Sequence, residues 1–370
     1  MTSILLFLLL PYMIVIVQWI FELRQKKTVD VKKHLNDKVS IVVPFRNEEK
    51  AIKNLLLSLI SQSFPKELFE IILIDDHSED QSVALVQSFL EKESNLRLLK
   101  LEEQTGKKAA IRLGIEKSQS DLIITTDADC VHDPNWLNLM VNSFLNEKPM
   151  LLCAAVKFST LDKDWKKVFN LEQAALMAAT AGSIKSGNAF MCNGANLMFP
   201  KALYLELKDE ELKTNLASGD DVFLLHALKQ KFGKESNISF LTAKEAIVST
   251  PFPSSWKEFL NQKIRWAQKG KYYKDKSARL YGLSILLANL SLFISFFAVF
   301  FNQMSFGQFA FIFGLKCLLD FLLLRQIQSW YPIKNAIVNV TLLSFLYPFY
   351  TVGIALLSLL YRPVWKGRKI

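Results

Sequence analysis

Long apolar runs at both ends of the chain constrain its fold most strongly. Residues 4–21, 280–301, 306–324 and 336–360 each come close to the roughly 20 apolar residues with which a helix crosses a bilayer. The composition of the 370 residues, 51% hydrophobic and 22% charged, is too apolar for an ordinary soluble domain and too charged for a pure membrane bundle. The chain is therefore predicted to combine membrane helices with a soluble domain.

The order of these runs predicts four regions. We expect a transmembrane anchor over residues 1–23, a soluble domain over 38–255, an amphipathic interfacial segment over 256–279 and a transmembrane region over 280–361. No basic residue precedes the first run and no small-residue cleavage site follows it, so an uncleaved anchor is favoured over a signal peptide.

Positive charge directly after the anchor predicts its orientation. The basic residues in this stretch are Arg24, Lys26, Lys27, Lys32 and Lys33. Because positive flanks stay on the cytoplasmic side, we expect an integral protein of the inner or plasma membrane whose soluble domain is cytoplasmic.

The C-terminal region leaves the number of spans open. Four spans with a cytoplasmic soluble domain would put the basic tail outside, where positive charge is disfavoured. The last run contains Pro348 and could instead form a re-entrant hairpin. The run before it carries Lys316 and Asp320 on one helical face, which could pair inside the membrane or face an aqueous interior.

The basic residues near the second apolar run favour a membrane-surface helix over a nucleic-acid-binding segment. Basic and aromatic residues alternate over 256–281 and contribute to the net charge of +10, a pattern that could suggest nucleic-acid binding. A helix lying on anionic lipid head groups is favoured, because a membrane segment follows at once.

The four cysteines have no paired spacing, which argues against a disulfide framework and against a zinc site.

The soluble domain alternates strand-like and helix-like segments. Strands are predicted at 39–44, 69–74, 96–101 and 121–126, and helices at 48–61, 81–90 and 107–117. Such alternation predicts an α/β, Rossmann-like fold: a mostly parallel sheet flanked by helices, with ligands at the carboxyl ends of the strands.

Paired acids follow two of these strands. Asp75 and Asp76 come directly after the second, and Asp127 and Asp129 after the fourth. A turn rich in helix caps is an alternative for the first pair. Four carboxylates at one sheet edge are costly, however, unless a cation or hydrogen-bond donors are present, so a metal site becomes the better account.

The second pair and a lysine suit a phosphate ligand. Asp127 and Asp129 can offer oxygens to Mg²⁺ or Mn²⁺, which keeps open positions for phosphate. Lys107 stands where a helix begins, so its ammonium and the backbone amides could face a phosphate, although a solvated lysine is the alternative. There is no Gly-x-Gly-x-x-Gly and no Walker lysine in the sequence, which weakens dehydrogenase and P-loop interpretations.

Six motifs in this order closely resemble those of family 2 glycosyltransferases with the GT-A fold, over residues 39–270. The motifs are Val42-Val43-Pro44-Phe45-Arg46-Asn47-Glu48-Glu49, Ile74-Asp75-Asp76-His77-Ser78-Glu79-Asp80, Gly106-Lys107-Lys108-Ala109-Ala110, Thr126-Asp127-Ala128-Asp129, Gly219-Asp220-Asp221 and Gln262-x-x-Arg265-Trp266. The flanking apolar helices look like the membrane-integrated branch that contains cellulose, chitin, hyaluronan and poly-N-acetylglucosamine synthases.

The resemblance implies roles for individual residues on the donor side. Asp75 or Asp76 would bind the nucleotide base, and Lys107 would lie near the uridine and phosphates. Asp127 and Asp129 match the motif that holds the metal and the diphosphate.

On the acceptor side, Asp221 matches the usual catalytic base, and Asp220 precedes it in the same motif. A helix N-cap ahead of residues 222–225 is the alternative for Asp220 and Asp221, and Asp220 could cap that helix even if Asp221 is the base. The remaining acceptor-side or interface residues implied by the resemblance are Cys192, Asn193, Gly194, Gln262 and Trp266, with Arg265 beside the diphosphate. The amino-acid sequence of the segment Phe190-Met191-Cys192-Asn193-Gly194 differs from that of the corresponding segment in the polymer synthases.

The expected activity follows from this chemistry. Direct displacement at an anomeric carbon needs a base, here Asp221, and an electrophile for the departing diphosphate, here the metal, and it inverts the anomeric centre. We expect an inverting transferase of the cell envelope that moves a sugar from a nucleotide sugar, in particular a UDP-sugar, to a lipid-linked or glycan acceptor. The alternatives are a processive polysaccharide synthase and, from another class, an inactive membrane scaffold or sugar-nucleotide sensor.

Overall fold

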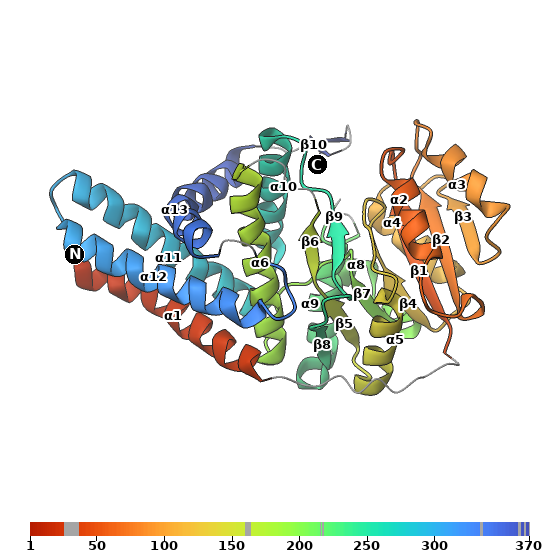
Figure 1. Cartoon of the computed structure of the whole chain (residues 1–370), viewed down its shortest axis with the longest axis horizontal. Coiled ribbons are helices and arrows are strands. Elements are labelled where there is room, and N and C mark those ends of the chain that lie inside the picture. Colours follow the sequence, from red (N-terminus) through yellow and green to blue (C-terminus); the bar gives the residue numbers. More distant parts are fainter. Residues whose placement is uncertain are drawn as a thin grey trace. The chain divides into compact units, whose positions relative to one another are not determined.

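The computed structural model describes residues 1–25, 37–159, 164–214, 216, 218–333, 336–361, 364–365 and 368–369 (Figure 1). The chain divides into two compact units. The α/β unit comprises residues 27–159 and 191–251, and the helical unit comprises residues 1–26, 160–190 and 252–370.

The α/β unit is built on a mostly parallel sheet. Its described strands are β1 (Val39–Phe45), β2 (Phe69–Asp75), β3 (Leu96–Lys100), β4 (Leu122–Thr125), β5 (Leu151–Ala154), β7 (Leu197–Pro200) and β8 (Ile238–Leu241). They lie in the order β3-β2-β1-β4-β7-β5-β8, and β7 runs antiparallel to both of its neighbours. A small parallel pair, β6 (Val156–Phe158) and β9 (Val248–Thr250), stands apart from this sheet.

Helices and short turns connect these strands. The helices of the unit are α2 (Ile52–Ile60), α3 (Ser82–Leu90), α4 (Lys107–Lys117), α5 (Trp136–Glu147), α7 (Lys201–Leu205), α8 (Asp209–Leu212) and α9 (Asp220–Phe232). The 3-10 turns are Lys66–Leu68 and Gly233–Glu235. The strands and helices expected between residues 39 and 126 are all present within a few residues of the expected bounds, so the α/β, Rossmann-like prediction is confirmed.

Burial explains why β1 and β2 consist mainly of apolar residues. All seven residues of each strand are buried, as in a parallel sheet covered on both faces. Helix α4 packs closely on them at Gly114, where a Cβ atom would lie 2.6 Å from Cγ1 of Val42 and 2.7 Å from Cδ1 of Ile74. A larger side chain at Gly114 would push α4, which begins at Lys107, off the sheet.

The helical unit contains six helices among the described residues. They are α1 (Thr2–Arg24), α6 (Asp164–Lys185), α10 (Trp256–Lys269), α11 (Lys276–Phe300), α12 (Phe306–Ile327) and α13 (Ala336–Leu360). A 3-10 turn at Gly270–Tyr272 and two short strands, β10 (Val364–Trp365) and β11 (Arg368–Lys369), complete its described elements. Within the described ranges, four helices (α1, α11, α12 and most of α13) are long and apolar enough to cross a membrane.

Helix α1 divides into a packed face and an exposed apolar face. Leu9 and Trp19 are buried, and α6 approaches Trp19 so closely that a Cβ atom on Gly182 would lie 2.6 Å from the Cβ of Trp19. The exposed side chains Phe7 and Ile14 lie along the other side of α1. An exposed apolar stripe along a span of this length is what lipid contact requires.

The structure shows how two of the apolar segments fold. Helix α13 continues through Pro348, so the described residues form a continuous helix and not a re-entrant hairpin. Nζ of Lys316 lies 2.7 Å from Oδ2 of Asp320 within α12, so these two charges are paired. The hydroxyls of Tyr12 and Ser344 also donate to Asp320. Lys26, Lys27, Lys32 and Lys33 lie outside the described residues.

Candidate active site

The acids expected at the sheet edge follow β2 and β4, two parallel strands that flank β1. β1 pairs with β2 on one side and with β4 on the other, and Phe45 stands opposite Asp75. Because parallel strands end at the same edge, the loops that begin at Arg46, Asp76 and Thr126 leave the sheet together.

Asp75 and Asp76 are buried and accept backbone hydrogen bonds. Oδ1 of Asp75 accepts from the amide of Ser78 over 3.0 Å, as in the turn considered from the sequence. Oδ1 of Asp76 accepts from the amide of Gly106 over 2.9 Å. Gly106 has φ +102°, which glycine adopts most readily, and it precedes α4 directly. Asp76 thus ties the end of β2 to the start of α4, where Lys107 stands.

Lys107 joins two carboxylates that are far apart in sequence. Its Nζ lies 2.8 Å from Oδ1 of Asp127 and 3.2 Å from Oδ2 of Asp220. Burial alone would lower the pKa of this ammonium, but the charges of Asp127, Asp220 and Asp221 outweigh burial and raise the pKa above its usual value. Lys107 is therefore a charged, ion-paired group and not the solvated lysine of the alternative interpretation.

Asp221 is held by two backbone amides at the start of α9. Its Oδ2 accepts from the amide of Gly194 over 3.1 Å, and its Oδ1 accepts from the amide of Val222 over 2.7 Å. Gly219, in the left-handed region, occupies the N-cap position, and Asp220 follows in the first turn. The structure thus places Gly219, and not Asp220, at the cap.

Gly194 lies where the carboxylates and the lysine meet. A Cβ atom on it would lie 2.8 Å from Oδ2 of Asp220, 3.4 Å from Cβ of Asp221 and 3.6 Å from Nζ of Lys107. Its carbonyl accepts from Oγ1 of Thr125 over 2.8 Å, which fastens the loop to the end of β4. Five of the expected residues, Lys107, Asp127, Gly194, Asp220 and Asp221, therefore form one cluster.

The neighbouring residues of the segment 192–194 have mainly structural contacts. The thiol of Cys192 is buried, and burial together with a hydrogen bond to Cys153 raises its pKa. Oδ1 of Asn193 accepts from the amide of Ala195 over 3.1 Å. Both contacts shape the loop that presents the Gly194 amide.

A buried histidine supports the loop that carries Asp127 and Asp129, and the sequence motifs did not indicate it. Nε2 of His132 lies 3.0 Å from Oγ1 of Thr126, and Nδ1 lies 3.3 Å from Oγ of Ser58. Burial lowers the pKa of His132 to about 3, so the ring is neutral at pH 7. Its position three residues after Asp129 is the signal by which it could have been noticed.

The carboxylates of Asp127 and Asp129 form the candidate donor set for a divalent metal. Among the described residues, no group of three or more His, Cys, Asp or Glu side chains stands close enough to hold a metal alone. Mg²⁺ and similar ions are commonly held by one or two carboxylates together with substrate phosphates. Asp127 and Asp129, spaced one residue apart and partly exposed, fit an ion that shares its ligands with a diphosphate.

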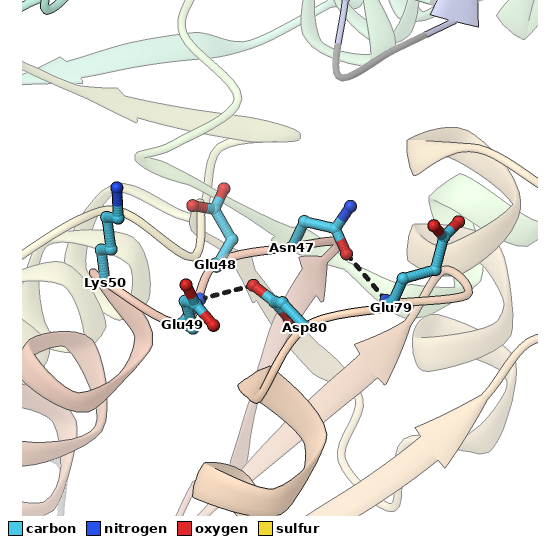
Figure 2. Close-up of a pocket in the computed structure, with 6 residues that line it drawn as sticks. All are labelled: Asn47, Glu48, Glu49, Lys50, Glu79 and Asp80. Atoms are coloured by element: carbon cyan, nitrogen blue, oxygen red, sulfur yellow. Dashed lines mark hydrogen bonds between the residues drawn. The ribbon is translucent and has the colours of Figure 1, made fainter.

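A cavity of about 450 Å³ lies at the loops that follow β1 and β2. Figure 2 shows the side chains that line it. The cavity is lined by Asn47, Glu48, Glu49, Lys50, Glu79 and Asp80. Oδ1 of Asn47 accepts from the amide of Glu79 over 2.8 Å, and Asp80 accepts from the amide of Glu49 over 3.0 Å. Burial opposes ionisation of Asp80, but donors at Ser82 and Glu49 lower its pKa overall. These bonds lock together the first two of the six motifs.

Gln262, Arg265 and Trp266 lie on α10 and belong to the helical unit. The helix starts at an N-cap, Ser255, whose hydroxyl accepts from the amide of Glu258 over 3.2 Å. The ring of Trp266 lies 4.6 Å from Nζ of Lys263. These three residues share one helix, while the acids and Lys107 belong to the α/β unit.

The fold has a solved counterpart. The mannosyltransferase PcManGT from Pyrobaculum calidifontis, in complex with GDP-Man and Mn²⁺, is similar with a TM-score of 0.57 and 16% identity, covering 93% of this chain and 96% of that one. This likeness concerns the fold alone, and it confirms a glycosyltransferase fold of GT-A type.

The family follows from the sequence match. Residues 40–207 match the family model described as glycosyl transferase family 2, and the chain therefore carries a domain of this family. An N-acetylglucosaminyltransferase of Rhizobium meliloti is 25% identical, over 70% of this chain and 61% of its own length. A dolichyl-phosphate beta-glucosyltransferase of Dictyostelium discoideum is 37% identical, over 25% of this chain and 30% of its own length. The chain thus spans less than two thirds of the length of these curated relatives.

Proposed function

We propose that the protein is a membrane-bound inverting glycosyltransferase. It moves a sugar from a nucleotide sugar, in particular a UDP-sugar, to a lipid-linked or glycan acceptor with the help of Mg²⁺ or Mn²⁺. The observation that carries the proposal is the cluster in which Lys107 contacts Asp127 and Asp220 next to Asp221.

On the donor side, the chain offers charge where a diphosphate needs it. Lys107 supplies an ammonium at the first turn of α4, where a diphosphate can also meet backbone amides. Asp127 and Asp129 would hold the divalent ion, which when bound neutralises charge on the departing diphosphate. Asp75 or Asp76 would bind the nucleotide base, since both stand at the end of β2, on the same edge of the sheet.

On the acceptor side, Asp221 is the base. The amides of Gly194 and Val222 fix the orientation of its carboxylate, which accepts the proton of the attacking hydroxyl. The hydroxyl oxygen forms the new bond to the anomeric carbon while the bond to the diphosphate breaks on the opposite face. A single displacement of this kind inverts the anomeric centre.

The helical unit supports an acceptor at the membrane. Four helices among the described residues have the length and composition of spans. Gln262, Arg265 and Trp266 would act at the acceptor and the diphosphate, where the planar guanidinium of Arg265 suits phosphate oxygens. A relative named for dolichyl phosphate is consistent with a lipid-phosphate acceptor. The soluble domain would be cytoplasmic, and a processive polysaccharide synthase is the second outcome of the same chemistry.

The test is transfer from a panel of radiolabelled nucleotide sugars in membranes that contain the protein, with Mn²⁺, with Mg²⁺ and with EDTA. Label in the organic phase after solvent partition is expected for a lipid acceptor, and insoluble label of high mass for a polymer. EDTA should abolish both. Absence of transfer from every donor, with nucleotide binding retained, would contradict the proposal and favour a scaffold or sensor.

A further inference from the structure

A buried ion pair within the helical unit links α10 to α6. Nζ of Lys263 lies 2.8 Å from Oε2 of Glu172, and the two side chains are only 5% and 6% exposed. The hydroxyls of Tyr347 and Tyr350 on α13 each donate to Oε1 of Glu172 over 3.4 Å. One carboxylate thereby connects three helices.

The lysine of this pair stands inside the Gln262-x-x-Arg265-Trp266 segment. Its ammonium lies 4.6 Å from the ring centroid of Trp266 and 5.1 Å from that of Phe259. A cation this close to an aromatic face is attracted to it, and more strongly where water is excluded. The position of the Trp266 ring therefore depends on where Glu172 holds the ammonium.

The pair also determines the direction of Arg265. An α-helix turns about 100° per residue, so Arg265, two positions after Lys263, is rotated from it by about 200° around the helix axis. With Lys263 held against α6, the Cα–Cβ bond of Arg265 leaves α10 on the opposite side. A rotation of α10 about its axis would move Arg265 and Trp266 together.

Stability alone does not account for these charges. Two ions lose hydration on burial, and well-packed apolar residues of similar volume commonly serve the stability of a fold equally well or better. Apolar packing, however, tolerates small rotations of a helix, whereas a 2.8 Å contact between two buried charges, with two tyrosine donors on the same carboxylate, resists them. The pair thus restricts how α10 is turned.

We propose that Glu172 and Lys263 are positioning residues for glycosyl transfer. They fix the rotation of α10, so that Arg265 and Trp266 are held in the orientation in which they act on the diphosphate and the acceptor. The inference rests on the proposed function, because it assigns a task to residues whose role is part of that proposal.

The test compares two matched double variants of the full chain in membranes. Glu172→Gln with Lys263→Met removes both charges and keeps an acceptor oxygen for the tyrosine hydroxyls. The control, Asp320→Asn with Lys316→Met, removes the buried pair within α12 and keeps an acceptor for Tyr12 and Ser344. Both variants should show similar changes in thermal midpoint.

Only the first variant should lose turnover, by about 10- to 100-fold in kcat, which is the range expected when a reacting group is misplaced by about 1 Å. Affinity for the nucleoside uridine, which lacks the diphosphate, should stay at the wild-type value, because the residues proposed to bind the base belong to the α/β unit. A merely structural role would instead lower kcat equally in the control, or lower uridine affinity as well.

Wild-type kcat in the Glu172→Gln, Lys263→Met variant would overturn the inference. If that variant does not fold, the double variant Tyr347→Phe, Tyr350→Phe tests the positioning role instead. It removes both hydroxyl donors to Glu172 and keeps the two aromatic rings. It should lower kcat several-fold at unchanged uridine affinity, and an unchanged kcat would again overturn the inference. Wild-type protein is assayed in parallel: if it transfers no sugar, the proposed function has failed, and not the positioning role alone.

Discussion

The backbone amide of Gly194 donates to Oδ2 of Asp221 over 3.1 Å, although the two residues lie 27 positions apart. A second amide, that of Val222, donates to Oδ1, so both oxygens of the carboxylate have a fixed direction. Such a carboxylate can take a proton from a hydroxyl that approaches along its remaining lone pairs. Two predictions depend on this contact.

Asp221→Asn should remove the base and keep the shape of the side chain. We expect transfer to fall by about 10²- to 10⁴-fold, the usual contribution of general base catalysis, while UDP affinity stays within a few-fold of wild type. Single-turnover transfer and equilibrium UDP binding on the same preparation measure the two effects. Turnover at the wild-type rate would exclude Asp221 as the base.

Gly194→Ala should disturb the same cluster by sterics. The new Cβ atom would lie 2.8 Å from Oδ2 of Asp220, so the carboxylate or the loop has to move. We expect a loss of about 1–3 kcal/mol in the free energy of unfolding, as for other overpacked sites, and a larger relative loss of turnover. Gly314→Ala in α12, where nothing lies within 4 Å of a new Cβ, is the control and should cost no stability, because alanine favours a helix more than glycine does. Equal effects of the two substitutions would contradict this account.

The local part of the fold was predictable because its signals are local. Apolar runs such as 69–74 mark strands that are buried on both faces, and the acids at 75–76 and 127–129 follow strand ends by chain order alone. Parallel pairing then brings those ends to one sheet edge. The lysine at the start of α4 was placed correctly for the same reason.

Long-range features were not predictable. The sequence did not indicate that β7 runs antiparallel between β4 and β5, or that α6 belongs to the helical unit. The contacts of Gly194 and of Lys263 join residues that only tertiary packing brings together. No spacing rule marks such pairs. A lysine inside a basic segment also looks solvated until its partner, Glu172, is known.

Lys107→Met should destabilise the α/β unit in a metal-dependent manner. Without the ammonium, Asp127 and Asp220 lose their shared cation. We expect the free energy of unfolding to fall by about 1–3 kcal/mol, the usual cost of leaving a partly buried charge unpaired. Mn²⁺ or Mg²⁺ should restore part of it, because a divalent ion can replace the missing positive charge, and UDP affinity should decrease.

Thermal midpoints with and without Mn²⁺ test this. The control is Lys66→Met, which breaks an ion pair with Glu93 whose lysine is 58% exposed, and such surface pairs contribute about 0–1 kcal/mol. A Lys107→Met protein as stable as the control would contradict the central role of Lys107 in the cluster.

His132 should make stability fall in mild acid. Its pKa is about 3 in the folded protein, against about 6.5 in an unfolded chain, so between these values the unfolded state binds the extra proton. Stability therefore decreases as pH falls through this window, by about 2 kcal/mol between pH 7 and pH 5. His132→Gln should remove this part of the slope while the contribution of the carboxylates remains. Midpoint temperatures of the full-length protein in detergent, measured from pH 7.5 to pH 5, give both profiles. Parallel profiles for wild type and variant would show that His132 does not stay neutral in the folded state.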